Sequence, residues 1–236
     1  MNIRPATATD LKIIAAWLKK EFNNSVAKHG FYNNIKLIEE GQKRGELTVA
    51  ADDRDNSPIA FYLGTESSVE ILEVKLDCRR KGIGRLLMEH VKKCAMDKGC
   101  LGISGFCSSK DSLPFWSEMR FEQVYNPNRI DEVAYPIRRK HQLPLNCKRY
   151  NITFKLYKDA DGSNLRKAQV ISAALYDQNY ELEEDFVEYV YNSDTLLIIE
   201  SANQTLYKDS IKYINDIGGE RDVPWLRVNK IKIIER

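Results

Sequence analysis

The sequence predicts an α+β protein built from two domains, and three observations lead to this fold class. Short extended segments alternate with amphipathic helical segments from the amino terminus to about residue 140. Within that stretch three extended runs follow one another, which predicts an antiparallel meander. A charged run ended by a proline, residues 138–144, then leads into a second set of strands and helices, and we interpret it as a solvated linker. We expect domains at residues 1–142 and 146–236, the second being a small α+β domain.

Composition and charge narrow the class of protein. The chain has 236 residues, of which 43% are hydrophobic, enough for packed cores. Five cysteines without a Cys-x-x-Cys pair favour neither a disulfide framework nor a zinc site, so we expect no metal. The longest aliphatic run covers residues 196–199, and the amino terminus has no signal-peptide pattern. We therefore expect a cytoplasmic protein without a membrane partner.

The first half begins with a strand at residues 2–5 and two helices. Thr7 and Asp10 form a capping-box-like start to the first helix, whose apolar residues recur at helical spacing. A second helix is expected at residues 33–43. The meander and the elements after it are expected as strands at 46–51, 58–64 and 69–76, a helix at 83–95, a strand at 101–107, a helix at 112–119 capped by Ser112, and strands at 121–125 and 132–137.

The second half carries no chemical motif. Its expected elements are strands at 150–157, 195–200 and 225–234 and helices at 164–176 and 205–217, with residues 186–191 compatible with either state.

The most informative motif is the turn from Arg79 to Gly84, Arg-Arg-Lys-Gly-Ile-Gly, between an extended run and an amphipathic helix. The first amides of a helix lack intrahelical partners and carry the positive end of its dipole, so an anion gains hydrogen bonds and charge there. Glycine at 82 and 84 removes the Cβ that would block the approach. The turn therefore predicts a phosphate-binding site, the alternative being a solvated basic turn.

With these elements in this order, the first roughly 140 residues resemble the GNAT superfamily of acyl-CoA-dependent N-acyltransferases. The turn matches the family motif as Arg79-x-x-Gly82-x-Gly84, and residues 115–121 stand where the family has a Phe-Tyr-x-x-x-Gly-Phe-like segment. The resemblance implies an α/β sandwich with a mixed, mostly antiparallel central sheet flanked by helices. It also implies direct transfer of an acetyl group from acetyl-CoA to a primary amine through a ternary complex.

The resemblance assigns the parts of the donor to two segments. The pyrophosphate is implied at the turn, on Arg79, Arg80, Lys81, Gly82, Ile83, Gly84 and Arg85. The pantetheine arm is implied along the backbone of Leu72, Glu73 and Val74, because a chain of amides can pair with a splayed strand edge. The amide of Val74 is implied to polarise the acyl carbonyl.

Two carboxylates on the same strand, Glu70 and Glu73, are candidates for a general base. By strict alternation they face opposite ways, so only one readily points at the reacting centre unless a bulge changes the count. We prefer Glu70, which shares parity with Leu72 and Val74, as the base, acting directly or through water. An ordinary solvent-facing glutamate is the equally weighted alternative for this residue. Glu73 is expected to act through its backbone.

The chain departs from the family pattern at two positions. Trp116 stands where relatives have a tyrosine that protonates the departing thiolate, and an indole cannot supply a proton at neutral pH. Tyr125, Ser117 or a water is the substitute, while Trp116 either lines the cofactor channel or packs in the core. Ser109 stands near the family's asparagine and is expected to contact the pantetheine.

The sequence does not identify the acceptor. A protein amine, a small molecule and the aminoacyl group of a charged tRNA all stay open. Residues 1–145 carry 23 basic and 19 acidic side chains, against 13 and 15 in residues 146–236, an asymmetry too small to indicate a nucleic-acid partner. A homodimer also stays open. The competing hypothesis is a non-catalytic regulatory module that binds acyl-CoA. In an acetyltransferase we expect the second domain to select or dock the acceptor, whereas in such a module it would respond to a partner protein.

Overall fold

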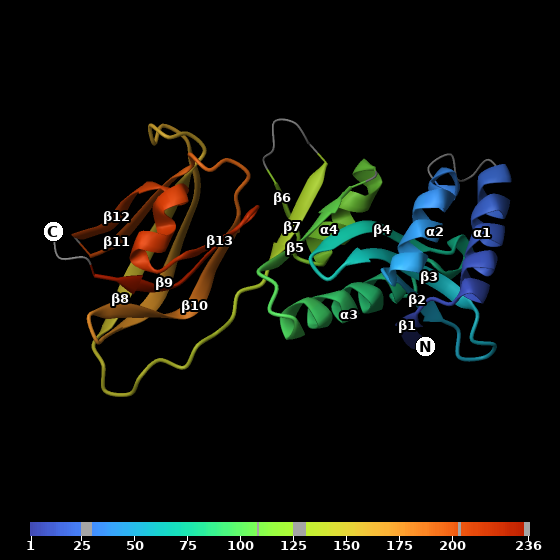
Figure 1. Ribbon diagram of the computed structural model, residues 1–236, viewed down its shortest axis with the longest axis horizontal. Helices are drawn as coiled ribbons and strands as arrows, with labels where there is room; N and C mark the ends of the chain where they lie inside the picture. The colour runs from blue at the N-terminus through green and yellow to red at the C-terminus, as the bar shows by residue number, and fades with distance from the viewer. Residues whose placement is uncertain (25–29, 108, 125–130, 203, 234–236) are drawn as a thin grey trace. The chain divides into compact units, whose positions relative to one another are not determined.

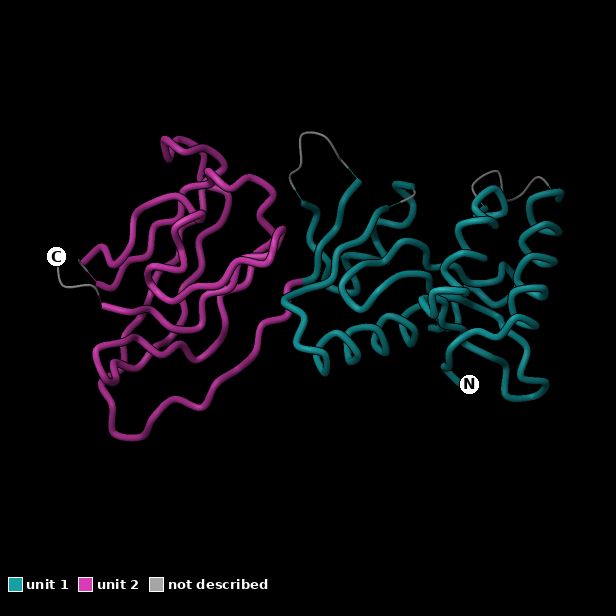
Figure 2. The backbone as a smooth tube through the Cα atoms, viewed as in Figure 1, with its two compact units in different colours: residues 1–135 teal, residues 136–236 magenta. Residues whose placement is uncertain are grey.

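The computed structural model describes residues 1–24, 30–107, 109–124, 131–202 and 204–233. The backbone forms two compact units, Met1–Tyr135 and Pro136–Arg236 (Figure 2). Each unit has its own seven-stranded sheet and its own hydrophobic core. No helix within the described ranges is both long enough and apolar enough to cross a lipid bilayer.

The first unit is built on a sheet with the strand order β1-β2-β3-β4-β5-β7-β6 (Figure 1). The strands are β1 (Asn2–Pro5), β2 (Leu47–Ala51), β3 (Pro58–Thr65), β4 (Ser68–Val74), β5 (Gly102–Phe106), β6 (Glu122–Gln123) and β7 (Glu132–Pro136). β4 pairs in parallel with β5, whereas β1 with β2, β2 with β3, β3 with β4 and β6 with β7 are antiparallel. The expected mixed, mostly antiparallel sheet and its meander are confirmed.

Helices cover both faces of this sheet. They are α1 (Ala8–Asn23), η1 (Phe31–Asn34), α2 (Ile35–Arg44), η2 (Leu76–Cys78), α3 (Ile83–Asp97), η3 (Lys110–Ser112) and α4 (Leu113–Glu118). Val49 belongs to the core cluster that α1 and α2 form with the sheet, and its neighbour Ala50 belongs to the cluster formed with α3. Because successive strand residues point to opposite faces, the sheet lies between α1 and α2 on one side and α3 on the other.

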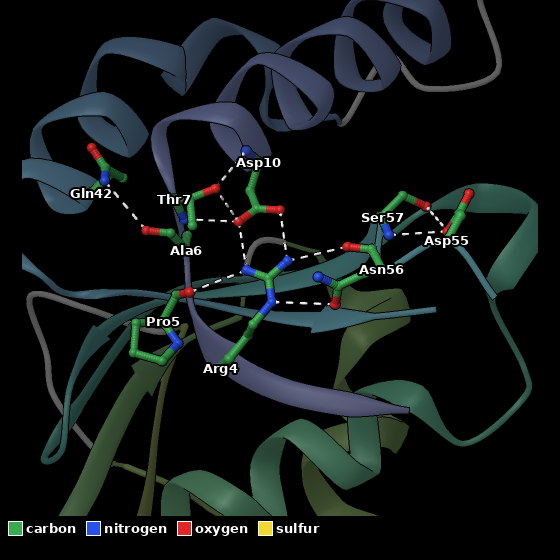
Figure 3. A network of polar contacts seen from close by, with 9 residues as sticks. All are labelled: Arg4, Pro5, Ala6, Thr7, Asp10, Gln42, Asp55, Asn56 and Ser57. Carbon is green, nitrogen blue, oxygen red and sulfur yellow. Dashed lines mark hydrogen bonds and ion pairs between the residues drawn. The ribbon is translucent and has the colours of Figure 1, made fainter. Parts of the chain in front are cut away.

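The start of α1 is fixed by the predicted capping box. The Asp10 amide donates to Thr7 Oγ1 at 3.2 Å, and the Thr7 amide donates to Asp10 Oδ2 at 2.8 Å (Figure 3). Arg4 on β1 adds two hydrogen bonds to the same carboxylate, at 2.6 and 3.0 Å. The Arg4 guanidinium, helped by Thr7 and opposed by burial, lowers the pKa of Asp10 to about 2. One buried carboxylate therefore ties the first strand to the first helix.

The second unit is a sheet with the order β12-β11-β8-β9-β10-β14-β13. The elements are β8 (Arg149–Tyr157), β9 (Leu165–Tyr176), β10 (Asn179–Tyr189), β11 (Leu196–Ser201), β12 (Gln204–Ser210), the 3-10 helix η4 (Ile211–Ile217), β13 (Glu220–Asp222) and β14 (Trp225–Lys232). η4 contributes Ile211, Ile214 and Ile217 to the core, where Phe154 and Phe186 stack with ring centroids 4.3 Å apart.

Two expected helices of the second unit are corrected by the structure. The helix expected at residues 164–176 is wrong, because this segment is β9, paired with β8 along most of its length and with β10 at its end. The helix expected at residues 205–217 is wrong over its first half, which is β12, while only η4 is helical. In both cases the backbone hydrogen bonds to neighbouring strands outweigh helix propensity. A local sequence pattern does not reveal these hydrogen bonds, because the partner strands lie elsewhere in the sequence. Residues 186–189 belong to a strand.

Candidate functional site

A cleft with a volume of about 750 Å³ lies where β4 ends and α3 begins. Three segments line it. They are the end of β4 with Leu72, Glu73 and Val74, the turn into α3 with Cys78, Arg79, Arg80, Gly82, Ile83, Gly84 and Arg85, and the α4 region with Asp111, Ser112, Pro114, Phe115 and Glu118.

The strand side of the cleft is a stretch of β4 beyond its pairing with β5. Among the described residues these strands pair only at Ser68↔Ser104 and Val69↔Gly105. On its other edge β4 stays paired with β3 as far as Val74. The segment Leu72 to Val74 therefore presents one backbone edge to the cleft, where a ligand made of amides can hydrogen-bond as a strand would.

The helix side of the cleft is a turn in which two residues adopt the left-handed backbone conformation. Arg80 has φ of 63° and Gly82 has φ of 79°, so the chain reverses just before α3. Gly82 is the N-cap of α3, makes no side-chain cap hydrogen bond, and is followed by a first turn without an acidic residue. A Cβ built on Gly82 would meet nothing within 4 Å, whereas one on Gly84 would lie 3.4 Å from Phe115 and 3.6 Å from Val74. The first amides of α3 thus face an open, uncapped space that favours an anion.

Glu73, Val74 and Arg79 form a connected group at the corner of the cleft. Glu73 Oε1 accepts hydrogen bonds from the Val74 amide at 3.0 Å and from the Arg79 guanidinium at 2.6 Å. Arg79 Nε also donates to the carbonyl oxygen of Val74 at 2.9 Å. Glu73 is only 8% exposed. Burial raises the pKa of this carboxyl, and Arg79 acts against the shift.

Most of the predicted donor-binding residues come together in the cleft, whereas Lys81 and the candidate base Glu70 do not line it. Leu72, Glu73, Val74, Arg79, Arg80, Gly82, Ile83, Gly84 and Arg85 all line it. Lys81 is exposed, and its Nζ donates to the Asp77 carbonyl at 3.0 Å. Glu70 is exposed at a β-bulge, because Leu63 pairs with Ile71 and Gly64 with Val69, which leaves Glu70 as the extra residue.

The structure places Trp116 and Ser109 outside the lining of the cleft. Trp116 is 5% exposed and packs edge-on against Phe115 and Phe121, which agrees with a core role. Ser109 accepts a hydrogen bond through its carbonyl from Ser112 Oγ at 2.8 Å. Ser112 is the N-cap residue of α4, as expected, but its side chain makes no cap hydrogen bond. Tyr125 lies outside the described residues.

Sequence reasoning missed the α4 side of the cleft. Phe115 packs closest to Gly84, and Glu118 forms an ion pair with Arg85. The two residues are three apart on α4, a spacing that places them on the same face of the helix. This spacing could have indicated that one face of α4 lines the cleft. Asp111 and Cys78 carried no such signal. Within the described ranges no group of three His, Cys, Asp or Glu side chains is arranged to hold a metal ion.

Comparisons with known proteins agree with this architecture. Residues 11–121 match the family model described as Acetyltransferase (GNAT) family. A peptidyl-lysine N-acetyltransferase, YjaB from Salmonella typhimurium, is 26% identical over 133 residues, which are 53% of this chain and 84% of that protein.

Solved structures are more distant in sequence. A GNAT-family acetyltransferase from Listeria monocytogenes is 12% identical, with a TM-score of 0.48 over 58% of this chain and 94% of that one. The PaiA N-acetyltransferase from Thermoplasma acidophilum, solved with coenzyme A, is 15% identical, with a TM-score of 0.46 over 58% of this chain and 98% of that one. On the family match, the first unit of this chain carries an acetyltransferase domain of the GNAT family.

Proposed function

We propose that the chain is an acetyl-CoA-dependent N-acetyltransferase that transfers its acetyl group directly to a primary amine in a ternary complex. The observation that carries the proposal is the meeting of two surfaces in one cleft, the uncapped amino terminus of α3 and the unpaired end of β4. The first suits the pyrophosphate of the donor, and the second suits its chain of amides. The thioester carbonyl then lies at the amide of Val74.

Glu73 is the proposed proton acceptor. An amine of lysine type has a pKa near 10.4, so its neutral form at pH 7 costs about 4.6 kcal/mol, at about 1.36 kcal/mol per pKa unit. Glu73 lies in the cleft, is buried, and has a raised pKa, whereas Glu70 is exposed outside the lining. A buried carboxylate with a raised pKa is a better base than an exposed one. Glu70 acting through water is the alternative.

The reaction conserves protons and electrons. The acceptor ammonium gives one proton to the base, its nitrogen attacks the thioester carbon, and the oxyanion forms beside the Val74 amide. Collapse breaks the carbon–sulfur bond, and the second proton of the nitrogen passes to the departing thiolate, directly or through a side chain such as Tyr125. Thiols have a pKa near 8.5, so the thiolate also leaves without a strong acid.

The acceptor class to test first is the lysine side chain of a protein. One curated relative, 26% identical over 133 residues, is a peptidyl-lysine N-acetyltransferase. We propose that the second unit docks or selects this acceptor. A small-molecule amine and an aminoacyl-tRNA are the other outcomes of the test.

A calorimetric titration with acetyl-CoA followed by a thiol-release assay tests the proposal. We expect acetyl-CoA to bind and thiol to be released with lysine peptides. Binding without turnover on peptide, small-molecule and aminoacyl-tRNA acceptors would favour a non-catalytic acyl-CoA-binding module. Absence of binding would overturn both functions.

A further inference from the structure

The group formed by Glu73, Val74 and Arg79, called here the corner clasp, connects the two parts of the proposed donor site. Arg79 begins the turn before α3, and Glu73 and Val74 end β4. Arg79 makes two hydrogen bonds across this corner, one to the Glu73 carboxylate and one to the Val74 carbonyl. The Glu73 carboxylate in turn accepts the Val74 amide.

The clasp engages the atoms that the reaction needs. The Val74 amide is the proposed donor to the acyl carbonyl, and in this structure it donates to Glu73 instead. Glu73 is the proposed base, and in this structure its carboxylate is held by Arg79 at 2.6 Å. A carboxylate that forms a charge-assisted hydrogen bond is stabilised as the anion, so it accepts a proton less readily.

Arg79 is also within reach of an anion at the turn. Its side chain is 44% exposed and lines the same cleft as Arg80 and Gly82. The partner that it holds, the side chain of Glu73, is 10% exposed. A diphosphate at the start of α3 offers Arg79 more oxygen acceptors and more negative charge than one carboxylate does.

The other charged groups near Glu73 do not replace Arg79. Glu21 from α1 acts on Glu73 with like charge, and its Oε1 accepts the Leu76 amide at 2.8 Å. Lys75 forms an ion pair with Asp77 at 3.2 Å. Arg79 is therefore the cation positioned to set the state of this carboxylate.

We propose that Arg79 is a positioning residue that couples the donor's diphosphate to the reacting centre. Bound diphosphate draws Arg79 from Glu73, which releases the carboxylate as a base and frees the Val74 amide for the thioester carbonyl. The inference rests on the proposed function and deepens it, because it assigns the diphosphate a part in turnover as well as in binding.

The test compares acetyl-CoA with S-acetylpantetheine, which has the thioester but no diphosphate. With the unaltered protein we expect kcat for the short donor to be lower than for acetyl-CoA by on the order of tenfold. Inorganic pyrophosphate added to the short donor should raise its kcat. In Arg79→Gln the clasp is already open, so kcat for the short donor should rise roughly tenfold and pyrophosphate should no longer activate.

Arg44→Gln is the matched control. Arg44 forms an ion pair with Glu46 at 2.6 Å and is 45% exposed, close to the values for Arg79, but it lies at the end of α2 outside the cleft. Its substitution should leave kcat for both donors unchanged. Arg79→Lys keeps the charge without the fork of donors and should fall between the unaltered protein and Arg79→Gln.

The outcomes separate the clasp from a binding role. If Arg79→Gln only raises KM for acetyl-CoA, with kcat for the short donor unchanged or lowered, the coupling is overturned. If pyrophosphate does not activate the unaltered protein, it is overturned as well. Failure of the proposed function is distinct, since it would appear as no turnover of acetyl-CoA by the unaltered protein on any amine.

Discussion

At the scale of single residues, Glu73 and Glu70 show how burial separates two carboxylates on one strand. Glu73 is 8% exposed beside the Val74 amide, and burial raises its pKa against the effect of Arg79. Glu70 is exposed at the bulge of β4. Strict alternation favoured Glu70 as the base, since it shares parity with Val74. The bulge and the turn of the chain after Val74 are tertiary features that this count does not contain.

Glu73→Gln should lower kcat by at least about a hundredfold, because a positioned base contributes roughly 10²–10⁴ to the rate. A base acts only when deprotonated, so activity of the unaltered enzyme should rise as pH passes upward through the pKa of Glu73. The raised pKa puts this acid limb above the ordinary glutamate range. The pH profile of kcat/KM measures it, and the variant should lose the limb.

Glu70→Gln is the companion variant on the same strand. We expect it to retain the acid limb and most of kcat, since Glu70 does not line the cleft. Loss of the limb in Glu70→Gln, with Glu73→Gln active, would assign the base to Glu70 instead.

At the scale of elements, α3 offers a matched pair of glycines for the turn. Gly82 and Gly99 have φ of 79° and 78°, and a Cβ on either meets nothing within 4 Å, but they lie at opposite ends of the helix. Leucine at either position should lower the free energy of unfolding by roughly 1–2 kcal/mol through the left-handed backbone. Only Gly82→Leu should weaken CoA binding, measured by calorimetry. Equal affinities in the two variants would show that the pyrophosphate lies elsewhere.

The junction of β1 and α1 makes a prediction about stability and pH. The pKa of Asp10 is lowered from 3.8 to about 2, which corresponds to about 2 kcal/mol of stability. A lowered pKa gives stability that is fully present above the unfolded value and is lost as pH falls through the folded one. Asp10→Asn should therefore destabilise the protein by about 2 kcal/mol at pH 7, with a difference that shrinks below pH 4.

Chemical denaturation at several pH values measures this difference. Asp53→Asn is the control, because the Asp53 side chain is 72% exposed and its substitution should change stability little at any pH. A difference for Asp10→Asn that stays constant down to pH 2 would rule out its ionisation as the cause.

Elements were predictable from sequence where local signals agreed. The helix from Ile83 and the capping box at Thr7 combine amphipathic spacing with start signals, and both are present in the structure. β9 was missed because the apolar residues Ala168, Ile171 and Ala174 recur at helical spacing. The segment is a strand because it pairs with β8, and its partners on β8 lie between 8 and 25 positions away in the sequence, from Tyr157↔Leu165 to Arg149↔Ala174.

At the scale of the whole molecule, every residue that lines the cleft lies between Leu72 and Glu118, inside the first unit. That unit has its own core, so residues 1–142 alone should fold and bind CoA with the affinity of the full chain. Turnover on protein lysines should fall in the shortened protein if the second unit docks the acceptor. Calorimetry and thiol release on both proteins measure the two effects, and loss of CoA binding by residues 1–142 would contradict the assignment.

The sequence by itself determined where we propose that the donor binds. The order of strand, glycine turn and helix is local, and the amides that suit an anion follow from the start of α3, so residues 79–85 could be named without coordinates. Only the tertiary structure decided which carboxylate enters the cleft, that Trp116 packs in the core, and that α4 supplies the opposite wall. These three features depend on the bulge in β4, on the end of the pairing between β4 and β5, and on contacts between segments that are distant in the sequence. Such features arise from pairing and burial across the fold, and a local pattern of residues does not encode them.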